Sequence, residues 1–533
     1  MSTPRWASRR RTLLRGGAVY SNVAPFATAL FLDGDTIAWV GDDSAADVYA
    51  DAADVVVDLG GALVAPGFVD AHVHATSTGM LLQGLDLSKA RSLAEALAGV
   101  QTFVQSAPPG LVVGHGWDET RWPEGRAPRL SELDAVSDGR EVYLSRIDVH
   151  SALVSSALRD AVFGLAGRAG YDSDGPLSQQ AHHAAREAVL DRIPASQRAD
   201  AHREFRARAA SLGIVGVHEM AGPTISSADD CRALLQLAAD EPGPLVAAYW
   251  GQVSRDGGID TARELGAVGV AGDLFVDGAI GSRTACMHAR YADADTTGAA
   301  YLSRDEIGAH VIDATRARMQ AGFHVIGDAA TSAVVGGLSD AAAVVGVDAL
   351  RAAGHRLEHA ELLDDAAVGV LAALSVTASM QPMFDGLWGG PGGMYEQRLG
   401  IERAESMNRF ADLAAAGVLV AFGSDAPVTE LGPWAAVRAA VQHSNPTQRM
   451  SARAAFSAHT RAGWRAIGEP GTGVIAPGAP AHLAIWAAED LVVQAPDERV
   501  AGWSTDPRSG TPGLPSLAGS GVLPRCLRTI VSG

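Results

Sequence analysis

The stretch Ala65-Pro-Gly-Phe-Val-Asp-Ala-His-Val-His74 decides the fold of this chain. It is an apolar run that ends in two histidines, His72 and His74, with one residue between them. Side chains on a strand alternate between its two faces, so residues at i and i+2 point the same way. We therefore expect both imidazoles to converge at the end of one strand, as a transition-metal site requires.

Apolar, strand-like runs alternate with alanine-rich helical stretches after this segment, which is the pattern of parallel βα units. Eight such units favour a closed (β/α)8 barrel, an α/β fold of the TIM-barrel type. The predicted strands are Phe68–His74, Ile214–Glu219, Leu245–Gly251, Leu274–Gly278, Phe323–Gly327, His355–His359, Val376–Gln381 and Leu419–Asp425. The gap between the first two is too long for a loop, so residues 75–210 are predicted to form a large insertion with its own structure.

Both ends of the chain are predicted to be all-β. Short apolar runs separated by turn signals such as Asp33-Gly34-Asp35 fill the N-terminal part, and similar runs follow Pro477-Gly478. Neither end has enough strands for a stable sheet alone, and chain ends often lie close together. We therefore predict one small β-sandwich from residues 1–66 and 470–533, with the barrel at 67–469 between them.

The composition indicates which partners and which cellular compartment to expect. The 533 residues are 47% hydrophobic, and 61 acidic against 42 basic side chains give a net charge of −19. An acidic surface argues against nucleic acid and anionic lipid as main partners. The three cysteines are too few and too scattered for a disulfide framework, and no run of about 18 apolar residues predicts a membrane span. We expect a cytoplasmic protein, and assembly of identical chains stays open.

Further polar residues end other predicted strands, at the edge where barrel enzymes carry their active sites. A single histidine or aspartate in such a place is usually structural, but several on different strands favour a metal site. Besides His72 and His74, the candidate ligands are Glu219, Asp273, His324, His359 and Asp425. The mixed set of imidazoles and carboxylates suits a divalent metal, with Zn²⁺ favoured and one or two ions per chain.

The motifs resemble those of the amidohydrolase superfamily, specifically its YtcJ-like and N-substituted formamide deformylase-like branch. The segments that carry the resemblance are Pro66–His74, Asp277–Ala285, His324–Asp328, Arg356–His359 and Gly423–Pro427. The resemblance implies a metal-dependent hydrolase with a small-molecule substrate, commonly one that cuts carbon–nitrogen bonds other than peptide bonds. The alternatives are an ester, lactone or phosphotriester hydrolase on the same scaffold and, as a third, a catalytically silent scaffold.

One departure from that family concerns the carboxylate between the metals. Many relatives carry a carboxylated lysine four residues before the Asp-Gly of the fourth strand, whereas this chain has Asp273 there. If that strand is Leu274–Gly278, Asp273 starts about 13 Å beneath the strand's mouth, beyond its reach. Glu219 is then the better candidate, although an error of about 2–4 residues in the predicted strand would return Asp273 to the site.

The catalytic assignment rests on Asp425. A bound metal would lower the pKa of a water molecule, and we expect Asp425 to accept that proton and pass it to the leaving nitrogen. Strand alternation places Asp70 on the same face as His72 and Glu358 opposite His359. Asp70 is therefore predicted, in preference to Glu358, to orient a metal-binding histidine.

Three residues are candidates for substrate contact: Trp117, His150 and Arg283. Trp117 would supply apolar area at the mouth of a pocket, or else pack the core of the insertion. Arg283 would bind a carboxylate or carbonyl oxygen, or else form a surface ion pair. The neighbouring His182 and His183 lack partners at ligand spacing and are predicted to be solvated.

Overall fold

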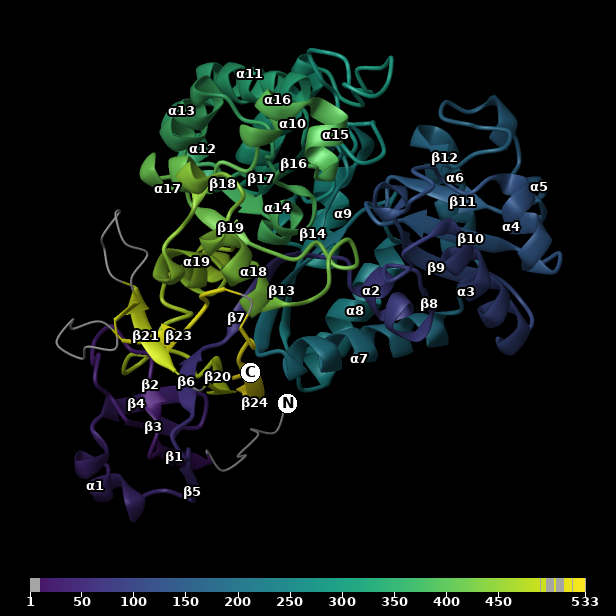
Figure 1. Ribbon diagram of the computed structural model, residues 1–533. Coiled ribbons are helices and arrows are strands. Elements are labelled where there is room, and N and C mark those ends of the chain that lie inside the picture. Colours follow the sequence, from purple (N-terminus) through teal and green to yellow (C-terminus); the bar gives the residue numbers. More distant parts are fainter. Residues whose placement is uncertain (1–9, 489, 495–502, 505–511, 520, 533) are drawn as a thin grey trace, which may run out of the picture.

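The computed structural model describes residues 10–488, 490–494, 503–504, 512–519 and 521–532. Its centre is the predicted parallel barrel sheet, with strand order β19-β18-β17-β16-β15-β14-β13-β7 (Figure 1). The strands are β7 (Phe68–Val73), β13 (Ile214–Ala221), β14 (Leu245–Trp250), β15 (Gly269–Val270), β16 (Gln320–Val325), β17 (Arg356–His359), β18 (Thr377–Met380) and β19 (Val420–Phe422). β7 and β13 are buried along their whole length, as expected of parallel strands with covered faces.

Helices of the barrel region follow the strands in sequence and lie around the sheet. They are α8 (Ala228–Asp240), α9 (Gly258–Leu265), α10 (Arg304–Ala317), α11 (Asp328–Val345), α12 (Val347–Ala353), α13 (Asp365–Leu374), α14 (Pro382–Trp388), α15 (Met394–Leu399), α16 (Ile401–Glu405), α17 (Phe410–Ala415), α18 (Pro433–Val441), α19 (Ala452–Ala458) and α20 (Arg461–Ala466). No single described helix has the length and apolar character to cross a membrane, and only α11 and α12 taken together, bent by 115°, meet that measure.

The first and last barrel strands meet at their carboxyl ends. The backbone N–H of Asp425 donates to the carbonyl of His72 at 2.8 Å, and His74 donates to Ala426 at 2.9 Å. Gly423 makes this approach possible, because a Cβ there would lie 2.5 Å from the His72 nitrogen. The seam therefore fixes the two histidines of β7 against the aspartate that follows β19.

The fourth strand differs from the prediction. β15 ends at Val270, which pairs with Ala321 of β16, and pairing resumes only where Phe275 lies opposite His324. The chain advances five residues between these points while β16 advances three, so the strand bulges outward. Asp273 lies in this bulge. Bulges of this kind re-aim side chains at the rims of barrels.

The two chain ends share sheets, as predicted for the β-sandwich. One sheet has the order β4-β3-β1-β5 and the other β2-β6-β20-β24, so strands from both ends lie in the second. Their side chains share one core, which includes Leu14, Leu30, Val64 and Leu483. The bounds are β1 (Arg11–Arg15), β2 (Ala18–Val19), β3 (Ala29–Asp33), β4 (Thr36–Gly41), β5 (Val55–Asp58), β6 (Leu63–Pro66), β20 (Leu483–Ala487) and β24 (Arg525–Ile530).

The segment between β7 and β13 forms a lobe of its own beside the barrel (Figure 1). It holds a five-stranded sheet of order β12-β11-β10-β9-β8. Its strands are β8 (Leu85–Asp86), β9 (Val112–Trp117), β10 (Val142–Arg146), β11 (Ser151–Val154) and β12 (Leu177–Ser178), and its helices are α2 (Ala75–Gln83), α3 (Leu93–Ser106), α4 (Leu130–Ser137), α5 (Ser156–Asp160), α6 (Gln179–Leu190) and α7 (Ala195–Ser211). The exact domain limits given above stay predictions.

Candidate metal centre and cavity

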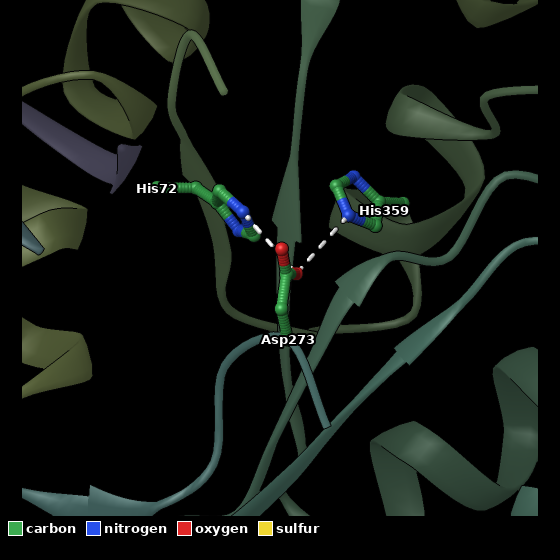
Figure 2. Close-up of side chains that lie close together, drawn as sticks. All are labelled: His72, Asp273 and His359. Atoms are coloured by element: carbon green, nitrogen blue, oxygen red, sulfur yellow. Dashed lines mark ion pairs between the residues drawn. The ribbon is translucent and has the colours of Figure 1, made fainter. Parts of the chain in front are cut away.

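Five side chains converge at the carboxyl ends of the barrel strands. The Nε2 atom of His74 lies 3.1 Å from a carboxylate oxygen of Asp273 and 3.1 Å from one of Asp425. The Nε2 atom of His72 lies 3.5 Å from Asp273 Oδ1 and 3.4 Å from Asp425 Oδ1. His359 approaches from β17, with its Nε2 atom 3.7 Å from Asp273 Oδ1, so Asp273 stands between two imidazoles in Figure 2.

The donor atoms of this cluster fit a divalent cation. Two overlapping groups, His72 with Asp273 and His359, and His72 with His74 and Asp425, each bring their ligand atoms within 4.8 Å of one another. His72 Nε2, Asp273 Oδ1 and Asp425 Oδ1 are buried and have no hydrogen-bond partner among the described residues. Buried polar atoms are rarely left unpaired, and imidazole and carboxylate lone pairs are the ligands that zinc-type ions take.

The electrostatics of the cluster also attract a cation. Burial lowers the pKa of His359, but Asp273 and Asp425 outweigh it and raise that pKa to about 9. Burial alone would raise the pKa of Asp273, yet the imidazoles of His72, His359 and His74 hold it well below its usual range. Asp273 therefore stays ionised in a buried site, and a divalent ion would compensate its charge.

Neighbouring residues hold the imidazoles with Nε2 facing inward. His72 Nδ1 lies 2.9 Å from Glu358 Oε2, and His359 Nδ1 lies 2.8 Å from Gln381 Oε1. Burial raises the pKa of Glu358, but Arg356 and His72 outweigh it and lower it to about 2. An ionised Glu358 accepts the Nδ1 proton of His72, so the Nε2 lone pair is free to bind a metal.

This arrangement corrects the predicted role of Asp70. The carboxylate of Asp70 accepts backbone N–H groups, from Ser424 at 2.8 Å and from His72 at 3.3 Å, and Glu358 contacts the His72 ring instead. Strand alternation failed because His359 has a φ of 68°, which breaks the strand geometry next to Glu358. Asp425 is also left-handed, with a φ of 55°, and such conformations cluster at functional sites.

Asp273, and not Glu219, is the carboxylate that lies among the imidazoles, so the predicted ranking of the two as metal ligands is reversed. The bulge after β15 brings Asp273 to the mouth of the barrel, among the imidazoles, so its predicted depth of about 13 Å was wrong. Glu219 on β13 belongs to neither group, and its Oε2 atom accepts the backbone N–H of Ala75 at 2.7 Å. Burial raises the pKa of Glu219 to about 7, against the lowering effect of His74.

His324 lies beside the cluster rather than within either group. Its ring centroid is 4.5 Å from that of His359 and 5.0 Å from that of His150. The Nδ1 atom of His324 is buried and has no hydrogen-bond partner in the described part of the chain. Its metal-binding role stays a prediction.

A cavity of about 90 Å³ extends from the cluster towards the insertion. Its wall includes His74, Asp273, His324, His359 and Asp425 at one end. Apolar side chains from α2 and α6, among them Met80 and Val189, form much of the rest. His150, predicted to contact substrate, lies on this wall, and burial lowers its pKa well below the ordinary range. It therefore presents a neutral imidazole to the cavity.

The other two predicted substrate contacts are corrected. Trp117 is 2% exposed, packs in the core of the insertion and donates its indole N–H to the carbonyl of Leu144. Arg283 forms a bidentate ion pair with Asp293, at 3.0 and 2.7 Å, away from the cavity wall. Core packing and a surface ion pair were the alternatives that the sequence left open, since both depend on tertiary contacts.

The predicted solvation of two histidines was also wrong. His182 is fully buried, with its Nε2 atom 2.7 Å from the hydroxyl oxygen of Tyr143. His183 is half-buried and stacks at 5.9 Å on Phe275, which lines the cavity. Sequence reasoning likewise missed Gln381, although its place at the end of a predicted strand was a signal.

A nearly closed parallel barrel that gathers imidazoles and carboxylates at its carboxyl edge is typical of metal-dependent barrel hydrolases. The family model "Amidohydrolase family" matches residues 55–533, and the chain belongs to that family. It is a metal-dependent hydrolase of the amidohydrolase type, and its family typically binds a divalent metal.

Known relatives agree with this assignment. The Bacillus subtilis (strain 168) protein "Putative amidohydrolase YtcJ" is 26% identical over 417 residues, which cover 72% of this chain and 74% of that protein. N-substituted formamide deformylase of Arthrobacter pascens is 30% identical over 139 residues, 26% of each chain. An uncharacterized metal-dependent hydrolase from Pyrococcus furiosus superposes with a TM-score of 0.68 at 26% identity, over 89% of this chain and 98% of that one.

Proposed function

We propose that this protein hydrolyses an amide-type carbon–nitrogen bond other than a peptide bond, in a small-molecule substrate. The observation that carries the proposal is the cluster of buried, unpartnered His72, Asp273 and Asp425 atoms beside a cavity. Similarity to the formamide deformylase of Arthrobacter pascens supports the choice of bond. The cytoplasm is the proposed compartment, and neither nucleic acid nor a membrane is a proposed partner.

The ligands would be His72, His74, His359, Asp273 and Asp425. His324 would be a further ligand if a second ion binds. Zn²⁺ is the proposed ion, because the ligands are imidazoles and carboxylates at the edge of a barrel. When bound, the ion would polarise the scissile carbonyl and make water acidic enough to ionise near neutral pH.

Asp425 would do the proton transfer. Its Oδ1 atom is buried, has no hydrogen-bond partner among the residues described, and belongs to a residue that lines the cavity from the loop after β19. The left-handed backbone and the bond from its N–H to His72 hold the side chain in place. Asp425 would take a proton from water and give it to the leaving nitrogen. The neutral imidazole of His150 would position the substrate on the opposite wall.

A substrate screen with metal-restored protein tests this function. Formamides, cyclic amides and aryl esters would be compared with wild-type protein and with His72→Ala, which removes a member of both ligand groups. We expect turnover of at least one amide class by wild type and its loss in the variant. Turnover of esters alone would favour an ester or lactone hydrolase, and full activity without metal would overturn the mechanism.

A further inference from the structure

One cation in the cavity wall has no ion-pair partner among the described residues. Arg186 of α6 lines the same cavity as Asp273 and Asp425, and no other described arginine or lysine lines it. Arg186 is half-buried and its Nε atom is fully buried, and its guanidinium forms neither a hydrogen bond nor an ion pair with any described residue. Arginine keeps its charge in proteins, so this cation is left uncompensated.

The neighbours of Arg186 do not supply the missing negative charge. Burial raises the pKa of the Tyr143 hydroxyl to about 12, so it stays neutral. Burial, with Arg186 itself, lowers the pKa of His183 to about 3 and that of His182 well below its usual range. Both histidines are therefore neutral. Burial also lowers the pKa of Arg186, and only Tyr143 and Asp273 act against it.

An unpaired charge in an apolar wall is destabilising and is normally retained only where something compensates it. The carboxylate of Asp273 already contacts the imidazoles of the cluster, with its oxygens 3.1 Å from His74 Nε2 and 3.5 Å from His72 Nε2. The rest of the wall near α6 is apolar, formed by Met80, Leu81, Val189, Leu190 and Ile193. The cavity thus combines the candidate metal ligands, an apolar wall and a lone cation.

We propose that Arg186 binds the carboxylate of the substrate, so that the enzyme acts on acylated nitrogen compounds that carry one carboxylate on a small apolar body. This inference rests on the proposed function for the identity of the bond that is cut. A guanidinium binds a carboxylate through two parallel hydrogen bonds, which fixes the orientation of the ligand. A single cation matches a monoanion better than a doubly charged phosphate.

Arg186 is therefore a specificity residue and not a catalytic one. With the carboxylate held at Arg186, the apolar body would lie along α2 and α6, and the scissile bond would reach Asp425. A buried charge pair of this kind is commonly worth a factor on the order of 10² in binding. The preference for acids over matched neutral amides should be of that size.

The test compares two substrates that differ in one group, N-formyl-leucine and N-formyl-leucinamide, with metal-restored enzyme. Wild type should favour the acid in kcat/KM by on the order of 10²-fold. Arg186→Met should abolish that preference by raising the KM for the acid, and Arg186→Lys should restore part of it. Arg192→Met is the matched control, because Arg192 lies just beyond α6 and outside the cavity wall.

A binding measurement separates this inference from the proposed function. Calorimetric titration with isocaproate should show binding to wild type and to Arg192→Met, and binding weaker by on the order of 10²-fold to Arg186→Met. Tight isocaproate binding without hydrolysis of any amide would contradict the proposed function but support the carboxylate-binding role of Arg186. Tighter binding of isopentylphosphonate would overturn the choice of carboxylate.

Two further outcomes would overturn the inference itself. Equal kcat/KM values of wild type for the acid and the amide would show that the cavity does not recognise the carboxylate. An equal loss on both substrates in Arg186→Met would assign Arg186 to structure alone. Thermal melting controls for misfolding: Arg186→Met should melt no lower than wild type, because it removes a half-buried cation that has no ion-pair partner among the described residues.

Discussion

Glu219→Gln is predicted to stabilise the protein in alkaline solution and to leave the metal in place. Glu219 is 3% exposed, and burial raises its pKa from the ordinary 4.5 to about 7. An acid whose pKa is raised by folding stabilises the fold only while it is protonated, and this contribution is lost as pH rises from 4.5 through 7. Glutamine cannot ionise, and its carbonyl can still accept the N–H of Ala75.

The size of the effect follows from the two pKa values. The gap between 4.5 and about 7, at about 1.4 kcal/mol per pH unit, amounts to about 3 kcal/mol. The variant should therefore exceed wild type in free energy of unfolding by about 3 kcal/mol near pH 8. By the same relation the advantage falls below about 1 kcal/mol near pH 5.

Urea denaturation of both proteins at the two pH values measures this difference, and metal analysis accompanies it. Glu187→Gln is the control, because Glu187 is exposed on α6 and should give no pH-dependent gain. A loss of stability at pH 8, or a loss of metal, would show that Glu219 is ionised and compensated, and it would return Glu219 to the set of ligands.

Three further changes have distinct expected outcomes. Asp425→Asn should retain much of the metal yet lose about 10²–10⁴-fold in turnover, since the amide cannot accept a proton. Unchanged steady-state turnover would show that Asp425 is not the group that transfers the proton. Glu358→Gln should weaken metal affinity by about 10–100-fold in a competition titration with a chelator, because His72 loses its ionised partner, and unaltered affinity would contradict that orienting role. Arg283→Met should leave KM unchanged, because Arg283 pairs with Asp293, and a raised KM would return Arg283 to the cavity.

The sequence predicted the barrel and most of the cluster because both depend on local pattern. Alternation along one strand was enough to bring His72 and His74 together. His359 and Asp425 were each predicted as the last residue of a strand. These residues sit where parallel strands end, which is a property of the topology rather than of detailed packing.

The failures arose where the backbone departs from regular geometry or where tertiary packing decides. The bulge after β15 moved Asp273 to the rim, and no strand count reveals two extra residues. A left-handed φ at His359 put Glu358, not Asp70, against the His72 ring. The place of Arg186 in the cavity wall depends on how the insertion packs against the barrel, which sequence periodicity does not encode.

Metal analysis of the purified protein, wild type beside His72→Ala, tests the central claim most directly. His72 belongs to both candidate ligand groups, so its removal should deprive either ion of a ligand. Wild type should contain roughly one to two equivalents of Zn²⁺ or a similar divalent ion per chain, and His72→Ala should contain far less and lose activity with it. Equal metal content in the two proteins, or full hydrolysis by metal-free wild type, would contradict the account.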